Sequence, residues 1–252
     1  MSKPSESPVI DVPGKIKIFV VSMSKDLVRR NQIKKNLAEL GLNFEFFDAI
    51  VGTELSNYER NKYSEKETVL YIGRELSQSE LGCALSHLYV YAKILEQGLD
   101  YAVILEDDVL LLNDFNRVVN AIVRRGQTFE IFNFLTDAPE IGTKEFLLNS
   151  YEITKLRFYS NRTTAYMVSR NAAARLLEVG FPIKTSADGL LGEKALHGLN
   201  LNGIYPNIAT LYPFESTINK GHYSASKIVT KRKKRSPKFW RGRWYVLKSG
   251  LR

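Results

Sequence analysis

Apolar residues recur along the chain at two spacings, which predict alternating strands and helices. Residues 15–22, KIKIFVVS, form a short β-branched run typical of a buried strand. After Ser24, a residue type that caps helices, apolar positions follow at helical spacing and stop at Gly41. Residues 43–52 then predict a second strand. A strand, a helix and a strand in this order are typical of a parallel sheet with crossover helices.

The rest of the pattern extends this architecture. Residues 53–75 are polar and weakly periodic, so we expect a surface excursion with one helical turn. A helix over residues 76–98 and a strand over residues 101–106 follow. Further along we expect a helix at 114–125, a strand at 129–135, a late pair of strands at 155–160 and 164–169, and a helix at 170–180. The prediction is an α/β fold with one mostly parallel sheet flanked by helices.

Three adjacent carboxylates, Glu106, Asp107 and Asp108, interrupt the most apolar stretch of the chain, YAVILEDDVLLL. Buried charges are costly unless they are paired or coordinated, so we expect a positive partner. Because alternate strand residues share a face, Glu106 and Asp108 should project together and Asp107 to the opposite side. Ligands of open α/β sheets bind beyond the carboxyl ends of strands, and carboxylates there suit Mg²⁺ or Mn²⁺. The alternative is a solvated acidic loop without a ligand.

Composition is that of a globular domain, with 44% hydrophobic and 25% charged residues among 252. The one cysteine, Cys83, excludes an internal disulfide, and we expect a buried helix residue there rather than a nucleophile. Residues 1–14 are polar and predict a disordered lead-in without a signal peptide. No apolar window is long enough to span a membrane. We therefore expect one folded domain over 15–222 and a separate tail over 223–252.

Several unlike motifs of this chain occur together in one known family. IKIFVVSMSKDLVRR, FEFFDAIVG, LSQSELGCALSHLYVYAKIL, YAVILEDDVLL and TTAYMVSRNAAARLL follow one another in that family's order. The most specific part is S-x-x-E-x-G-C-x-x-S-H, followed about twenty residues later by E-D-D. Over roughly residues 15–220, the chain resembles glycosyltransferase family 25, the bacterial lipooligosaccharide galactosyltransferases. The resemblance implies a GT-A fold, a UDP-sugar donor and an inverting transfer.

The resemblance places the acidic triplet at the metal-binding D-x-D motif of such enzymes. It implies that Asp108 binds Mn²⁺ or Mg²⁺, with Glu106 in the first position of the motif instead of aspartate. Glu106 is a metal ligand in this interpretation, or it contacts the ribose or a water of the metal shell. Asp107 is expected on the donor side. A late histidine often completes the metal shell in GT-A enzymes, which makes His222 a third candidate ligand.

The donor nucleoside is expected where the first two strands end. Val21 and Ser22 end the first strand, and Asp48 and Ala49 end the second. These ends lie close together in a strand–helix–strand unit, where backbone groups and a carboxylate bind nucleosides. The alternative for Asp48 is a turn at the end of its strand.

Two residues of the long helix are also candidates for donor binding. Ser77 and Glu80 form the S-x-x-E pattern of a capping box, although Glu80 could still face the donor. His87 is either a structural histidine or a donor of a hydrogen bond to the diphosphate. A third histidine, His197, is expected at a helix C-terminus, where the dipole favours it.

A carboxylate must also take the proton of the acceptor hydroxyl, and Asp188 is the candidate general base. Its alternative is an N-cap or turn aspartate. Arg29 and Arg30 match a basic pair of the family, although a solvated helix face is the simpler account for at least one of them. Thr163, Thr164 and Tyr166 are expected on a strand that lines the acceptor side, although core packing explains Tyr166 equally well.

The basic charge of the chain is confined to its end. Twelve of its 36 lysines and arginines follow Glu215, where no acidic residue occurs, which leaves 24 basic against 27 acidic residues before that point. Trp240 and Trp244 lie among these charges. Basic residues and aromatic rings together favour an anionic membrane surface. The alternatives are a solubilising disordered tail or a nucleic-acid patch; no nucleic acid is expected as partner.

Taken together, the residues and the resemblance predict a metal-dependent glycosyltransferase. It would move a hexose, galactose from UDP-galactose, onto a lipooligosaccharide. It would act in the cytoplasm, as a peripheral protein on the inner face of the bacterial inner membrane. The alternatives are UDP-glucose or UDP-N-acetylglucosamine as donor, and a non-catalytic adaptor that binds membranes or nucleic acid. A nucleotidyl or phosphoryl transferase would need a glycine-rich loop after the first strand, and VVSMSKDL has none.

Removal of the residues after Lys227 should lower co-sedimentation with anionic vesicles, because it deletes most of the basic charge of the tail. Transfer to a soluble acceptor should remain largely intact, since the catalytic domain is expected to end before the tail. Equal sedimentation of the full and shortened chains on anionic vesicles would contradict the membrane interpretation.

Overall fold

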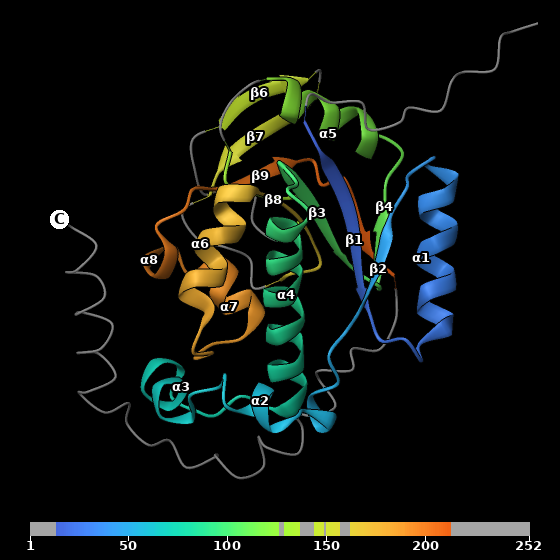
Figure 1. Cartoon of the computed structure of the whole chain (residues 1–252). Helices are drawn as coiled ribbons and strands as arrows, with labels where there is room; N and C mark the ends of the chain where they lie inside the picture. Colours follow the sequence, from blue (N-terminus) through green and yellow to red (C-terminus); the bar gives the residue numbers. More distant parts are fainter. Residues whose placement is uncertain (1–13, 126–128, 137–143, 149, 157–161, 213–252) are drawn as a thin grey trace, which may run out of the picture.

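The computed structural model describes residues 14–125, 129–136, 144–148, 150–156 and 162–212 (Figure 1). Its strands are β1 (Ile16–Ser22), β2 (Glu45–Asp48), β3 (Tyr101–Glu106), β4 (Val109–Leu111), β5 (Ile131–Asn133), β6 (Lys144–Leu148), β7 (Tyr151–Lys155), β8 (Ala165–Ser169), β9 (Leu201–Tyr205) and β10 (Ala209–Leu211). Its helices are α1 (Leu27–Glu39), α2 (Asn57–Arg60), α3 (Glu65–Ile72), α4 (Gln78–Glu96), α5 (Phe115–Arg124), α6 (Arg170–Gly180), α7 (Ala187–Gly192) and α8 (Lys194–His197), with a 3₁₀ turn, η1, at Gly52–Glu54.

Eight of these strands form one sheet in the order β2-β1-β3-β8-β5-β9-β7-β6, and β4 pairs with β10 separately. The predicted α/β class, with helices on a central sheet, is confirmed (Figure 1). The sheet is mixed rather than mostly parallel. β1 pairs in parallel with β2 and β3, and β5 with β9, whereas the β3–β8, β5–β8, β7–β9 and β6–β7 pairs are antiparallel. An apolar run predicts a buried strand but carries no information about its direction.

A late pair of strands was predicted at 155–160 and 164–169, and most of the first one, residues 157–160, lies outside the described residues. β8 does form at residues 165–169, but it lies between β3 and β5, and β7 pairs with β6 and β9. β8 is buried, and its partners are far from it in sequence, so nothing local identifies them. The excursion at 53–75 contains η1, α2 and α3, which is more helix than the one turn expected.

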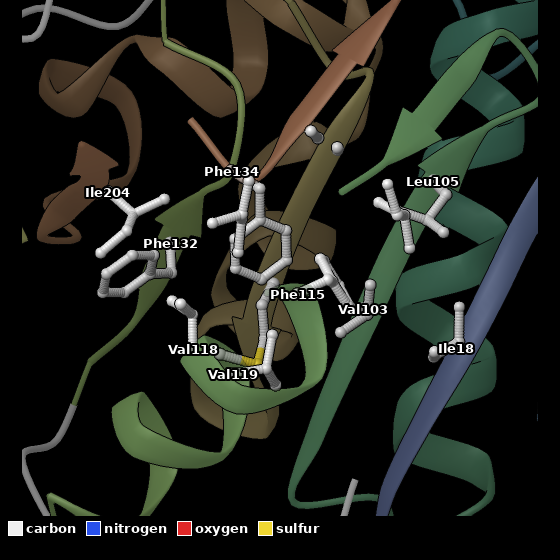
Figure 2. Close-up of a cluster of buried hydrophobic side chains, with 14 of the residues drawn as sticks. Ile18, Val103, Leu105, Phe115, Val118, Val119, Phe132, Phe134 and Ile204 are labelled. Atoms are coloured by element: carbon white, nitrogen blue, oxygen red, sulfur yellow. The ribbon is translucent and has the colours of Figure 1, made fainter. Parts of the chain in front are cut away.

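Alternation along the central strands divides the core between the two faces of the sheet. Ile18 and Val20 of β1 pack on one face with residues of α1 and α5. Phe19 and Val21 pack on the other face with residues of α4 and α6. Figure 2 shows part of the first cluster, in which Phe115 of α5 lies among strand residues. Because β1 and β3 are covered on both faces, their ends are held in fixed positions.

The helix ends follow their predicted signals closely. The capping box of α4 is confirmed, since Ser77 accepts from the Glu80 amide and the Glu80 carboxylate accepts from the Ser77 amide. The N-cap of α1 is Asp26 rather than Ser24, and its carboxylate accepts from the Arg29 amide at 3.3 Å. Gly41 has a φ of 65°, which fits the predicted end of that helix.

His197 does end α8, as predicted, but the helix dipole is not the reason. The side chain is 3% exposed, its Nδ1 accepts from the Leu199 amide at 2.9 Å, and its Nε2 lies 3.2 Å from the Leu191 carbonyl oxygen. Burial lowers the pKa of His197 to about 4, so the ring is neutral at physiological pH. A neutral ring gains little from a dipole, and its role is to bond buried backbone groups.

α4 and the segment after β2 approach each other more closely than side chains allow. A Cβ at Gly82 would lie 2.5 Å from the Ile50 carbonyl oxygen and 2.8 Å from the Gly52 nitrogen. A Cβ at Gly52 would lie 1.7 Å from the Gln78 carbonyl oxygen. Both glycines therefore permit a backbone contact that holds α4 against η1.

No helix in the described ranges is long and apolar enough to cross a bilayer. Residues 1–13 of the lead-in predicted over 1–14, and the basic tail over 223–252, lie outside the residues that the structure describes.

Replacement of Gly82 by alanine should destabilise the protein by about 1 kcal/mol or more. Helix propensity alone favours alanine by about 1 kcal/mol, but the added methyl group collides with backbone atoms, and such overpacking costs about 1–3 kcal/mol. Asn31→Ala, at an exposed position of α1, is the matched control and should stabilise slightly. Chemical denaturation measures both. A stabilised Gly82→Ala protein would contradict the close approach.

Candidate functional site

A cavity of about 230 Å³ lies where the first three strands of the sheet end. β1 is parallel to β2 and to β3, with Ser22 opposite Asp48 and Val21 opposite Glu106, so their carboxyl ends meet at one edge. The segment after β2 and the first turns of α4 form the other walls. The lining residues are Val21, Ser22, Met23, Arg29, Ala49, Ile50, Val51, Gly52, Thr53, Ser79, Cys83, Ser86, His87, Glu106, Asp107 and Asp108.

Most of the residues proposed from the sequence meet at this cavity. Seven of them line it, namely Val21, Ser22, Ala49, His87, Glu106, Asp107 and Asp108. Asp48, Glu80 and Asp188 do not line it. His222 lies outside the described residues.

Arg29 of α1 is the positive partner that the acidic cluster requires. Its Nη1 lies 3.0 Å from Asp107 Oδ1 and 3.9 Å from Asp108 Oδ2. Asp107 Oδ2 accepts a second hydrogen bond, from Ser22 Oγ, at 2.7 Å. Both carboxylate oxygens of Asp107 therefore accept hydrogen bonds, and these bonds connect the ends of β1 and β3 to α1. Asp107 also lines the cavity instead of pointing away, because residues 107–108 form a turn in which strand alternation no longer applies.

Asp108 differs from Asp107 in its hydrogen bonding. Its Oδ1 is buried and has no hydrogen-bond partner among the described residues. Burial and the nearby Glu106 and Asp107 charges raise the pKa of Asp108 to about 6, and the Arg29 guanidinium only partly offsets them. An unpaired buried carboxylate oxygen is costly, so this atom is suited to a ligand that brings positive charge.

Glu106 is held as an anion on the other side of the cluster. Thr163 Oγ1 donates to Glu106 Oε1 at 2.5 Å, and the Glu106 amide donates to the Thr164 carbonyl oxygen at 2.8 Å. Burial alone would raise the pKa of Glu106, but contacts with His87, Thr163 and Thr164 outweigh it and leave the pKa below its usual value. The two carboxylates of one cavity thus differ in pKa, because contacts lower that of Glu106 whereas burial and like charges raise that of Asp108.

His87 connects the cavity to a buried pair of tyrosines. Its Nδ1 lies 2.7 Å from the Tyr166 hydroxyl, which lies 2.9 Å from the Tyr91 hydroxyl. Its Nε2 lies 3.7 Å from Glu106 Oε1 and has no hydrogen-bond partner among the described residues. The ring is 1% exposed. Tyr166, the candidate for the acceptor side, is a core residue that orients this imidazole.

The second arginine of α1 holds the end of β2. Arg30 Nη2 donates to the Ser22 carbonyl oxygen at 2.8 Å, pairs with Asp48, and lies over the Phe46 ring at 4.6 Å. The side chains of Arg29 and Arg30 are 12% and 17% exposed, so the solvated helix face expected for at least one of them is wrong. Asp48 is 70% exposed at the rim and is used as a partner of Arg30.

Glu80 and Asp188 lie beyond the cavity wall. Glu80 is 6% exposed. Arg74 donates a hydrogen bond to each of its carboxylate oxygens, at 2.6 and 2.8 Å, and the Ser77 amide donates the bond of the capping box. This carboxylate has no capacity left for a donor sugar. Asp188 lies in the first turn of α7, whose N-cap is Ser186, and α7 packs against α4. Its charge contributes to the raised pKa of the Cys83 thiol, after burial and the Glu106 charge.

A divalent cation fits the acidic end of this cavity. Asp108 Oδ1 has no partner in the part of the chain that the structure describes, and Glu106 lines the same space. Both offer the oxygen ligands that Mg²⁺ and Mn²⁺ prefer. Asp107 is the weaker candidate ligand, since Ser22 and Arg29 each donate to one of its oxygens.

Sequence reasoning missed two features of this site. Cys83 was expected to be an inert buried residue, yet it is half-buried and lines the cavity. Its position four residues before His87 on one helix was the available signal, because such residues share a face. The tyrosine pair behind His87 had no local signal, since Tyr91 and Tyr166 are 75 residues apart.

Comparison with known proteins identifies a family and several relatives. A family model described as glycosyltransferase family 25 (LPS biosynthesis protein) matches residues 15–191. The lipooligosaccharide biosynthesis protein lic2B of Haemophilus influenzae is 27% identical over 62% of this chain and 56% of its own length. The lacto-N-neotetraose biosynthesis glycosyltransferase LgtE of Neisseria meningitidis is 34% identical over 63% of this chain and 59% of its own length.

An animal protein also matches: procollagen galactosyltransferase 1-B of Xenopus laevis is 28% identical over 66% of this chain and 29% of its own length. The chain thus spans under a third of this relative and little more than half of the two bacterial ones. The family match covers most of the chain, including β1, the long helix α4 and the acidic turn. The chain belongs to glycosyltransferase family 25.

Proposed function

We propose that this chain is a metal-dependent glycosyltransferase that transfers a hexose, galactose from UDP-galactose, to a lipooligosaccharide. The observation that carries the proposal is the Asp108 carboxylate oxygen, which no described residue pairs with, in a cavity at the carboxyl ends of β1, β2 and β3. Family membership supplies the reaction class. The bacterial relatives named for lipooligosaccharide or lacto-N-neotetraose biosynthesis support the acceptor, and the procollagen galactosyltransferase supports the sugar.

The nucleoside end of the donor is proposed to lie against the ends of β1 and β2. Val21, Ser22 and Ala49 offer backbone groups and small side chains there. The Ala49 amide donates to the Ser22 carbonyl oxygen at 2.9 Å, which keeps the two strand ends together. Arg30 holds the same carbonyl group from the helix side. The edge is therefore preorganised before a ligand arrives, which reduces the cost of binding.

The diphosphate is proposed to lie over Asp108 and Glu106. These two residues would hold Mn²⁺ or Mg²⁺, and the bound cation would stabilise the negative charge that develops on the departing UDP. Arg29 and Ser22 hold Asp107, the residue before Asp108, and so help to position the turn that presents Asp108. His87, behind Glu106, has a ring nitrogen available on the cavity side.

The acceptor hydroxyl needs a base, and Asp188 remains our proposal for it. It is a partly exposed carboxylate in the first turn of α7, close enough to the inner cavity for its charge to act on Cys83. A single displacement with this base would invert the anomeric centre. The basic tail is proposed to hold the enzyme on the membrane that carries the acceptor.

Replacement of Asp108 by asparagine should weaken Mn²⁺-dependent binding of UDP by about 100-fold or more, because it removes a first ligand of the cation. Glu96→Gln, an equal loss of charge at an exposed position of α4, is the matched control and should bind as the parent does. Titration calorimetry with UDP, with and without Mn²⁺, measures both. Cation-dependent binding that survives in Asp108→Asn would contradict the proposed ligand.

The affinity for Mn²⁺ should rise with pH through about 6. Below the raised pKa of Asp108 the carboxyl group is protonated and the cation must displace that proton, whereas above it the charged ligand is ready. The expected change is up to about tenfold per pH unit on the acidic side, with a plateau above. Electron paramagnetic resonance of free Mn²⁺ between about pH 5 and about pH 8 measures it. A flat profile would exclude Asp108 as the titrating ligand.

The donor sugar is tested separately from the cation site. Release of UDP should be fastest with UDP-galactose among UDP-galactose, UDP-glucose and UDP-N-acetylglucosamine. A faster turnover of either other donor would replace galactose and leave the rest of the proposal standing. Mn²⁺-dependent binding of UDP without turnover of any of the three would favour a non-catalytic adaptor.

A further inference from the structure

The inner wall of the cavity holds a second group of ligand atoms, distinct in chemistry from the carboxylate pair. Cys83 and His87 lie four residues apart on α4, and Glu106 ends β3 beside them. One ligand atom from each of the three lies within 4.8 Å of the others. Asp108 is not a member of this group. A thiol, an imidazole and a carboxylate together are the ligand set of zinc rather than of magnesium.

His87 gives independent evidence that a ligand belongs here. Its ring is 1% exposed, and Nε2 has no hydrogen-bond partner among the described residues although it lies 3.7 Å from Glu106 Oε1. Nδ1 is already occupied by the Tyr166 hydroxyl at 2.7 Å. A buried ring nitrogen without a partner is costly, and this one faces the other two ligand atoms.

The residues behind these ligands have the arrangement found around metal sites. A histidine that binds a metal almost always bonds its other nitrogen to a protein oxygen, which fixes the ring. Tyr166 is that oxygen for His87, and Tyr91 in turn bonds Tyr166 at 2.9 Å. Thr163 Oγ1 donates to Glu106 Oε1 at 2.5 Å and also interacts with the Cys83 thiol. The imidazole and the carboxylate are therefore each oriented by a neighbour.

We propose that Cys83 Sγ, His87 Nε2 and Glu106 bind one Zn²⁺ ion at the inner wall of the cavity. The fourth position of the ion faces the open cavity, as in zinc sites with three protein ligands. On binding, the sulfur–zinc bond replaces the sulfur–hydrogen bond, and the proton passes to solvent. The site shares Glu106 with the proposed donor site but uses a nitrogen and a sulfur ligand in place of Asp108.

Cobalt substitution tests this site directly, because Co²⁺ takes the zinc position and bonds between cobalt and thiolate absorb in the near ultraviolet. Cys83 is the one cysteine of the chain, so such a band reports this residue alone. We expect the band with one equivalent of Co²⁺, in the full chain without any donor, and its loss on addition of Zn²⁺. Asp108→Asn and Glu96→Gln should keep the band, since neither residue belongs to the site.

Two variants test the other ligands. His87→Gln and the nearly isosteric Tyr166→Phe should each weaken Zn²⁺ binding by about 10- to 100-fold, measured by competition with a chromophoric chelator. Tyr166→Phe keeps the proposal testable if His87→Gln does not fold. Absence of the cobalt–thiolate band, or equal Zn²⁺ affinity of Tyr166→Phe and the parent chain, would overturn the site. Either result leaves the UDP and Mn²⁺ experiments on Asp108 unaffected, so the two proposals fail separately.

Discussion

The contact between Arg29 and Asp107 is the interaction around which the cavity is organised. Three carboxylates end a buried strand, and their mutual repulsion at short range in a protein is worth about 4 kcal/mol per pair at 4 Å. Arg29, 3.0 Å from Asp107 and 3.9 Å from Asp108, offsets much of that cost. Ser22 satisfies the remaining oxygen of Asp107. One oxygen of Asp108 is left without a partner among the described residues, and the proposed cation would bind there.

The pairing of the strands and the position of α4 bring the other lining residues to the same cavity. Parallel pairing of β1 with β2 and β3 places three strand ends at one edge, and α4 closes the space beside them. α4 comes this close because Gly82 and Gly52 have no side chains. One face of α4 then supplies Cys83, Ser86 and His87 to the wall. The proposed binding of UDP and the proposed binding of Zn²⁺ would therefore use neighbouring atoms in the wall of one cavity.

Patterns within short segments of the sequence predicted individual helices, strands and a helix cap. The spacing of apolar residues located β1, α4, β3 and α6, and S-x-x-E located the capping box at Ser77. The place of the acidic residues after an apolar strand located the cavity edge. The direction of β8 and its two neighbours could not be predicted, because they depend on contacts between distant segments. The same holds for the roles of Arg29 and Tyr166, whose partners are 78 and 79 residues away.

The most direct test of the central claim is a crystal structure of the chain with UDP and Mn²⁺, in which anomalous scattering locates the cation. The account predicts one Mn²⁺ bonded to Asp108 Oδ1 and to the diphosphate, with Asp107 still held by Arg29 and Ser22. A cation bound elsewhere, with Asp108 Oδ1 still without a ligand, would contradict it.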